Sequence, residues 1–244
     1  MTDVIAEAEN LSPLKHLISQ NIQNGSFKIE NPHSSVSIFN FHYAKPPITV
    51  EMNYGFNKPI GDNETGFNGI EDVHYRTEAW DFITAGGALF NNLDYSFTAG
   101  NEEGNFVVPP KQPGGGGPSL RNQLETLKNV FGEFDFIRMK PSNYLLKDSI
   151  SGNAAVRILA EEGEQYLLYL NNSNADKSFH PESEVDKVSS YEISMELPAG
   201  NYKGEWIDPV TGLRTRFSVR DHKGGAVNFK TPLVREDLAL KLTR

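Results

Sequence analysis

The strongest constraint on the fold is a change of sequence pattern near Pro141. Before it, short apolar runs alternate with stretches of helical spacing or of polar loop residues, which predicts parallel strands joined by crossovers. From about residue 153, short apolar runs follow closely on one another, separated by turns rich in Gly, Asn, Asp and Pro, which is typical of an antiparallel β-sandwich. The seven expected strands lie within residues 154–163, 164–173, 188–200, 202–212, 213–225, 226–232 and 236–244. The sequence therefore predicts an α/β domain over residues 1–148 and an all-β domain over residues 149–244.

Apolar runs in the first domain mark the expected strands. Most of them end in polar residues, and they span residues 16–22, 35–43, 48–56 and 87–97. Residues 75–87 and 120–134 carry apolar side chains at helical spacing, and the first of these stretches ends in a Gly-Gly stop. Trp80 lies on the apolar face of the first helix and is expected in the core. Trp206 is expected to pack between the two sheets of the sandwich.

The acidic charge of the chain disfavours two classes of partner. A formal net charge of −9 argues against nucleic acid or an anionic membrane. The chain has no cysteine, which excludes disulfides, thiolate catalysis and Cys-based metal sites. His16, His42 and His74 share no ligand spacing on one element, so we expect no metal and no cofactor.

The N-terminal residues bear on the cellular location. No apolar run approaches the roughly 18 residues that a membrane span requires. The stretch from Met1 to Lys15 is acidic and polar, unlike a signal peptide. We therefore expect a cytoplasmic protein for the chain as written. If the true N-terminus lies upstream, the expected location becomes periplasmic or extracellular.

Polar residues gather at the ends of the expected strands, where parallel α/β folds place their functional side chains. Amides and carboxylates hydrogen-bond sugar hydroxyls, and aromatic faces stack on sugar rings. The candidate substrate-binding residues are Gln20, Asn21, His42, Tyr43, Asn92, Asp94 and Tyr95. Glu64 is the candidate catalytic nucleophile, because retaining glycosidases use one carboxylate in that role. Asp62 and Asn63 are expected to shape the loop around it and to orient it.

Each candidate also has an ordinary structural interpretation. Taken alone, Glu64 is more often a solvated loop acid, and Asp62 is as well explained as a turn or helix-cap residue. His42 at a strand end is more often a hydrogen-bonded core residue, and Asp94 could anchor nearby backbone amides. The four glycines at 114–117 are expected to form a flexible loop, because no Gly-Lys-Ser/Thr ending follows them.

Several stretches resemble a known family. The runs NYGFNKPIGDNETGF, YRTEAWDFITAGGALFNNLDYSFT and PGGGGPSLRNQLETLKNVFGEFDFIRMKP resemble the C-terminal portion of bacterial cellulase-like glycoside hydrolases with a (β/α)8, or TIM, barrel. The tail, with the pattern W-x-D-P-x-T-G starting at Trp206, is similar to the collagen-binding-type β-sandwich that commonly follows such barrels. The resemblance covers nearly the whole chain and implies a carbohydrate substrate.

The resemblance also implies roles for individual residues. In these barrels the nucleophile follows strand 7 after a Lys-Pro pair, and Lys58, Pro59 and Glu64 match that placement. The implied ends of the other strands are Gln20 and Asn21 for strand 5, His42 and Tyr43 for strand 6, and Asn92, Asp94 and Tyr95 for strand 8. Glu64 is thereby favoured as the nucleophile over a solvated loop acid.

The chain departs from the family in its number of strands. A (β/α)8 barrel needs eight strands and typically about 250 residues, but only about the last four βα units can be placed before the sandwich. The strand whose end supplies the acid/base, often an Asn-Glu pair, has no counterpart here. We therefore interpret the chain as the C-terminal part of a longer enzyme, inactive alone, that needs its N-terminal half or a second copy of itself.

A non-enzymatic function is the alternative. The chain could be a carbohydrate- or protein-binding module in which the β-sandwich binds the ligand and the barrel strands are a remnant. A purely structural sandwich, packed against the barrel, is favoured over a binding one. Its aromatic residues Tyr191, Tyr202 and Trp206 are scattered and form no exposed row for a sugar chain.

Overall fold

The N-terminal part forms a four-stranded parallel sheet in a computed structural model, which describes residues 1–147, 150, 154–172 and 189–244. Its strands are neighbours in sequence order: β1 (Ser19–Asn24), β2 (Ile38–His42), β3 (Ile60–Thr65) and β4 (Leu89–Asn92). The described helices of this part are α1 (Thr2–Leu11), α2 (Ile48–Asn53), α3 (Asp72–Thr84) and α4 (Pro118–Phe131), with short 3₁₀ turns η1 (Tyr54–Phe56), η2 (Phe136–Arg138) and η3 (Asn143–Leu145). Parallel neighbours require crossover connections, which α2 supplies between β2 and β3 and α3 between β3 and β4.

The C-terminal part forms two antiparallel sheets. The six-stranded sheet contains, in spatial order, β10 (Arg214–His222), β9 (Gly200–Ile207), β12 (Asp237–Thr243), β7 (Gln165–Asn171), β6 (Ala155–Glu161) and β5 (Lys140–Pro141). The two-stranded sheet pairs β11 (Gly225–Lys230) with β8 (Glu192–Leu197). Each of the seven stretches expected to be strands contains one, and β5 is an addition. The predicted boundary between residues 148 and 149 lies outside the described residues.

Side chains from both antiparallel sheets share one apolar core. Strand β7 contributes Tyr166 and Leu168 to this core, while Leu167 and Tyr169 belong to a second cluster against the helices. Successive residues of a strand face opposite sides, so the nearly continuous apolar run of β7 reflects burial on both faces. Trp206 lies in the shared core with 5% of its surface exposed, as the sequence predicted.

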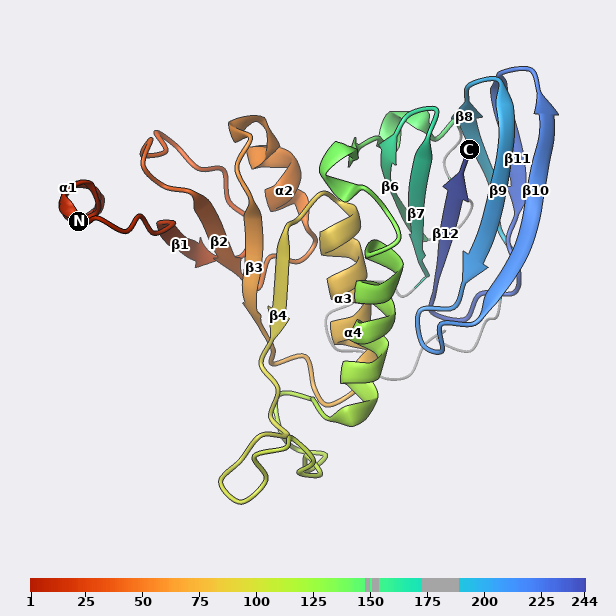
Figure 1. The fold of residues 1–244 in the computed structure, drawn as a ribbon. Helices are drawn as coiled ribbons and strands as arrows, with labels where there is room; N and C mark the ends of the chain where they lie inside the picture. Colours follow the sequence, from red (N-terminus) through yellow and green to blue (C-terminus); the bar gives the residue numbers. More distant parts are fainter. Residues whose placement is uncertain (148–149, 151–153, 173–188) are drawn as a thin grey trace.

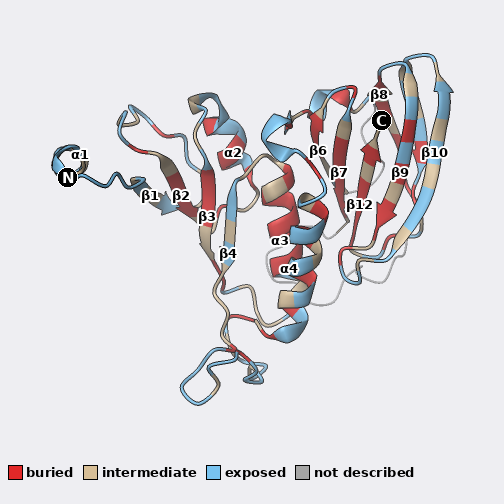
Figure 2. Ribbon diagram, viewed as in Figure 1, coloured by how far each residue is buried: buried red, intermediate tan, exposed pale blue. Residues whose placement is uncertain are grey.

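Helices α3 and α4 lie between the parallel sheet and the six-stranded sheet (Figure 1). Nine of the 13 residues of α3 are buried, and Figure 2 shows this helix mostly in red between the two layers. Phe82 packs toward the parallel sheet, while Trp80 stacks on Tyr169 of β7 with ring centroids 5.4 Å apart and ring planes 15° apart. The single helix therefore carries apolar contacts to both parts of the chain.

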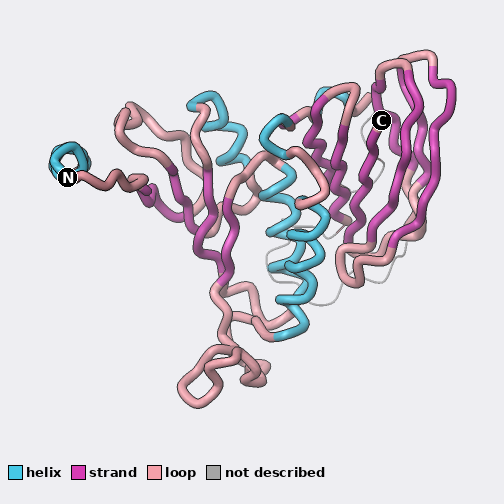
Figure 3. Tube along the Cα trace, in the orientation of Figure 1, coloured by secondary structure: helices cyan, strands magenta, loops and turns pink. Residues whose placement is uncertain are grey.

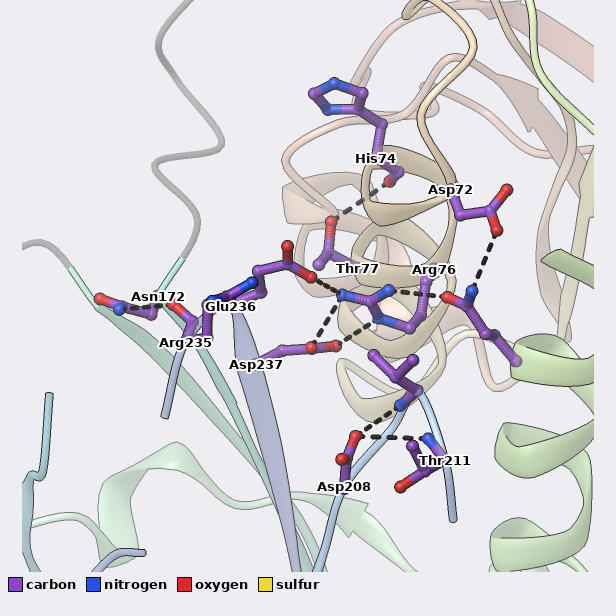
Figure 4. A network of polar contacts seen from close by, with 12 residues as sticks. Asp72, His74, Arg76, Thr77, Asn172, Asp208, Thr211, Arg235, Glu236 and Asp237 are labelled. Atoms are coloured by element: carbon purple, nitrogen blue, oxygen red, sulfur yellow. Dashed lines mark hydrogen bonds and ion pairs between the residues drawn. The ribbon is translucent and has the colours of Figure 1, made fainter. Parts of the chain in front are cut away.

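A buried ion pair joins α3 to the last strand (Figure 4). Arg76 donates from Nε and Nη2 to the two carboxylate oxygens of Asp237, each at 3.0 Å, and from Nη1 to Gln123 at 2.7 Å. The Tyr169 hydroxyl donates to the same carboxylate at 2.9 Å, and Glu236 accepts a further bond from Arg76. The bidentate geometry and the extra donors satisfy charges that would otherwise be costly to bury.

The prediction of a strand over residues 48–56 is wrong. Residues 48–53 form α2 and residues 54–56 form η1, and the strand of this region is β3 over residues 60–65. Thr49, Val50 and Asn53 are buried on one side of α2. The Asn53 side chain accepts a bond from the Ile29 backbone N–H and donates to the Phe27 carbonyl. These tertiary bonds and the helical spacing of the buried residues outweigh the β-propensity of the run.

One face of the parallel sheet is open. Figure 1 shows α2, α3 and α4 on one side of the parallel sheet and α1 set apart from it, beyond β1. Leu89 is 43% exposed on the opposite face, and Asn91 two residues later is exposed as well. The long loop between β4 and α4 extends beyond the carboxyl ends of the strands (Figure 3). Among the described residues, no helix is long and apolar enough to cross a membrane.

Removing the buried arginine tests the connection between the two parts. Arg76→Ala is expected to lower the free energy of unfolding by about 3–5 kcal/mol, because it leaves Asp237 buried without its counter-charge. Arg138→Ala is the matched control: its 2.6 Å pair with Glu161 is 66% exposed on the arginine side, so the loss should stay below about 1 kcal/mol. Urea denaturation measures both, and equal losses would contradict the assignment.

Candidate functional site

A β-bulge in β3 turns two neighbouring acids to opposite faces of the sheet. Phe41 of β2 is level with Asp62 of β3, but the next β2 residue, His42, is level with Glu64. Asn63 is therefore the extra residue of a bulge. Without it, residues two apart would share a face. Asp62 instead faces α3 together with the buried Phe41, and Glu64 lies beside His42 at the carboxyl edge of the sheet.

Glu64 is partly exposed and is held by the two residues that end β2. The Tyr43 hydroxyl donates a 2.7 Å hydrogen bond to Glu64 Oε1. His42 Nδ1 lies 3.7 Å from Oε2, which is longer than a hydrogen bond but within reach of a charged contact. The Tyr43 backbone N–H also donates to the Glu64 carbonyl at 2.9 Å. The expected proximity of these three residues is present.

The surroundings of Tyr43 keep its hydroxyl protonated, so that it can donate a hydrogen bond. Burial and then the bond to Glu64 raise the pKa of its phenol to about 12, so it keeps its proton throughout the neutral range. Its backbone has a φ of 56°, a left-handed conformation that is uncommon outside glycine. Such conformations persist where surrounding contacts impose them, and they gather at functional sites. The Ala44 N–H next in sequence donates to Asp62 Oδ2 at 3.0 Å and helps to impose this one.

Asp62 is a buried acid of β3, whereas the sequence analysis expected a loop residue. It is fully buried, and its Oδ1 has no hydrogen-bond partner among the described residues. Burial and then the neighbouring Glu78 carboxyl raise the pKa of Asp62 to about 7. Burial likewise raises the pKa of Glu78, which accepts a 2.8 Å bond from the Thr65 hydroxyl. Asp62 still shapes the turn after β2 through its bond to Ala44.

Asp94 has a structural partner. Arg121 of α4 donates to its Oδ2 at 2.7 Å, and the Ser96 backbone N–H donates to its Oδ1 at 2.9 Å. Burial would raise the pKa of Asp94, but the bonds from Ser96 and Arg121 outweigh it and lower the pKa. These contacts match the alternative interpretation of Asp94 as an anchor. Tyr95 follows the anchor, beyond the end of β4.

The glycine run at the end of the long loop is required by close packing, whereas the sequence suggested a flexible loop. A Cβ at Gly114 would lie 2.1 Å from the Tyr95 ring, and one at Gly116 would lie 2.0 Å from the Asp94 carboxylate. The Gly115 carbonyl accepts a bond from the Tyr95 N–H at 3.0 Å. Only glycine allows this close approach, which holds the segment of Asp94 and Tyr95 against the loop.

The predicted amide residues are dispersed. Gln20 and Asn21 lie in the first half of β1 and not at its end, because the strand begins at Ser19. Asn24 is the β1 residue level with His42. The structure thus separates Gln20 and Asn21 from the group around Glu64.

Two further amides lie on strands next to this group. Asn63 is the bulge residue, and its carbonyl accepts a 3.2 Å bond from the Asn91 side chain. Asn92 ends β4 level with Thr65. The side-chain Oδ1 of Asn63 and Nδ2 of Asn92 are buried without a partner among the described residues.

Phe67 lies beside the candidate site, and the sequence analysis did not name it. It is 56% exposed, and its ring lies 6.1 Å from that of Tyr43 and 6.3 Å from that of Tyr95. The signal was a single aromatic residue between Gly66 and Gly69, in a turn where a polar residue is usual. Within the described part of the chain, no three His, Asp or Glu side chains are placed to hold a metal ion.

The raised pKa of Asp62 predicts a pH-dependent stability. Between about pH 4, near the unfolded pKa, and the folded pKa of about 7, the folded state holds a proton that the unfolded state releases. Wild-type stability should therefore fall as the pH rises through this range. Asp62→Asn should remove the cost of ionising this buried carboxyl at high pH. Its gain in unfolding free energy over the wild type should therefore be larger at pH 8 than at pH 5 by on the order of 2–4 kcal/mol.

Urea denaturation at pH 5 and pH 8 measures the effect. Glu125→Gln is the matched control, because Glu125 is exposed on α4. Its substitution should change stability by the same small amount at both pH values. An Asp62→Asn effect that is equal at pH 5 and pH 8 would contradict the burial of a protonated carboxyl behind Glu64.

The fold is similar to that of solved glycoside hydrolases. No protein-family model and no curated protein matches the chain. A structure named glycoside hydrolase matches 94% of the chain with a TM-score of 0.65 and 12% identity, over 57% of its own length. A family 5 glycoside hydrolase from Bacteroides vulgatus matches 99% with a TM-score of 0.65 and 14% identity, over 58% of its length.

A third neighbour is the maltogenic α-amylase AmyB from Thermotoga neapolitana. It matches 98% of the chain with a TM-score of 0.56 and 9% identity, over 58% of its own length. The chain thus spans somewhat more than half of each of these structures. The chain is similar in fold to glycoside hydrolases of the TIM-barrel type over that length, and it has a parallel sheet followed by antiparallel sheets.

Proposed function

We propose that the chain is the C-terminal part of a retaining glycoside hydrolase in which Glu64 is the nucleophile. The observation that carries the proposal is the position of Glu64: at the carboxyl edge of a parallel sheet, partly exposed, and oriented by the Tyr43 hydroxyl at 2.7 Å. Catalytic residues of parallel barrels lie at this edge. The fold shared with glycoside hydrolases supports the same reading.

The parallel sheet is proposed to be the last four strands of a (β/α)8 barrel, and the antiparallel sheets a β-sandwich of the collagen-binding type. The sequential strand order and the open face of the sheet fit such a half barrel. So does the 57–58% coverage of the neighbours. The acid/base would come from the other half, supplied by an N-terminal segment or a second copy of the chain.

The chemistry that Glu64 would perform is a displacement at the anomeric carbon. A carboxylate oxygen forms a bond to this carbon while the bond to the leaving oxygen breaks, and water later releases the sugar. The Tyr43 hydroxyl orients the attacking group, and the Asn63 bulge turns it to the open face. The leaving oxygen normally takes a proton from the acid/base, which contributes roughly 10²–10⁴-fold.

An activated glycoside tests Glu64 without an acid/base. A 2,4-dinitrophenyl 2-deoxy-2-fluoro-glycoside loses a phenolate that needs no proton, so slow labelling of the chain by one glycosyl unit is expected. Intact-mass measurement detects the adduct, and peptide mapping should place it on Glu64. Glu64→Gln should abolish it, whereas Glu71→Gln, an exposed acid at the start of α3, should not. An adduct that persists in Glu64→Gln contradicts the proposal.

The half-barrel interpretation predicts association. Uncovered strand edges and the open face favour a partner, so light scattering of the purified chain should show a dimer or larger species. Leu89→Lys, on the open face with 43% exposure, should shift the chain toward monomer. Leu213→Lys, in an exposed turn of the antiparallel part, is the control and should not. A monodisperse wild-type monomer would contradict self-association.

A further inference from the structure

Phe67 is an exposed aromatic residue in a strained conformation. Its backbone has a φ of 60°, and 56% of the residue surface is exposed. A bulky residue with positive φ is a conformational outlier, with a cost that a glycine would avoid. An exposed ring recovers little of that cost by burial. The combination therefore points to a use for the ring outside folding.

The turn that carries Phe67 is fixed from both sides. The Tyr75 hydroxyl donates to the Gly69 carbonyl at 2.7 Å and accepts bonds from the Asn68 and Gly115 N–H groups, both at 3.3 Å. The Gly69 N–H donates to the Pro113 carbonyl at 2.9 Å. The turn after β3 is thus tied to α3 and to the glycine run, and Phe67 at its start remains more than half exposed.

The Phe67 ring belongs to a row of aromatic side chains that begins with Tyr43, the hydrogen-bond partner of Glu64. Tyr43 donates to Glu64, the Phe67 ring lies 6.1 Å from Tyr43, and Tyr95 lies 6.3 Å beyond in an edge contact. His42 adds an edge contact with Tyr43 at 6.4 Å. Rings fixed in this way present a rigid apolar surface at low entropic cost beside the candidate nucleophile.

We propose that Phe67 is the sugar-stacking residue next to Glu64 and positions a neutral pyranose unit of the substrate. This inference rests on the proposed function. The apolar C–H face of a pyranose matches an exposed ring, and the net charge of −9 disfavours acidic sugars. Stacking beside Glu64 would orient the anomeric carbon, which is how positioning residues lower a barrier.

Replacing Phe67 by glycine distinguishes an effect on binding from an effect on stability. Phe67→Gly removes the ring but accepts the positive φ, so its melting temperature should stay within about 2 °C of the wild type or rise. Binding of neutral hexasaccharides of glucose, xylose and mannose, measured by calorimetry and ligand-observed NMR, should weaken about tenfold or more. Phe67→Trp should bind within about threefold of the wild type, because it keeps a ring.

The outcomes distinguish the inference from the proposed function. Unchanged binding by Phe67→Gly overturns the role of Phe67, even if Glu64 is labelled by the activated glycoside. Weak binding by both Phe67→Gly and Phe67→Trp, or no binding by the wild type, overturns it as well. Selective loss in Phe67→Gly supports the inference, and failure of Glu64 labelling in the same preparation would then refute only the nucleophile.

Discussion

The structure depends on one helix that is buried on both sides. Helix α3 packs its Phe82 against the parallel sheet and its Trp80 against Tyr169 of the six-stranded sheet. A helix in this place cannot be amphipathic, so its polar residues need buried partners. Arg76 has Asp237, and Asp81 has Arg157 at 2.9 Å. Helix α3 therefore joins the two parts of the chain through apolar contacts and buried ion pairs.

The same helix sets the chemistry behind the candidate site. Glu78 of α3 faces Asp62 across the back of β3, and burial raises the pKa of both carboxyls. One added strand residue, Asn63, separates this buried acid from Glu64 on the other face. Two acids of similar sequence context thus have different surroundings: Asp62 is buried behind the strand, where a charge is costly, and Glu64 is partly exposed at the edge of the sheet.

The sequence predicted much of the fold, and its errors have physical causes. Closely spaced apolar runs and glycine turns identified seven of the eight described C-terminal strands, because these patterns are local in the sequence. The strand predicted for residues 48–56 was wrong because the apolar and β-branched residues of this stretch favour a strand, whereas the bonds from Asn53 to a distant loop favour a helix. Asp62 was expected in the loop around Glu64 but lies in β3, because a bulge cannot be recognised from the alternation of apolar and polar residues. Phe67 was missed because its exposure depends on Tyr75, Pro113 and Gly115.

By itself, the sequence determined the order of the two architectures and the grouping of His42, Tyr43 and Glu64. These follow from local periodicity and from the rule that parallel strands end at one edge. Only the tertiary structure decided that Asp62 is buried, that Arg121 holds Asp94 and that Phe67 extends the aromatic row. Those outcomes depend on contacts between residues far apart in the chain, whose partners no local pattern names.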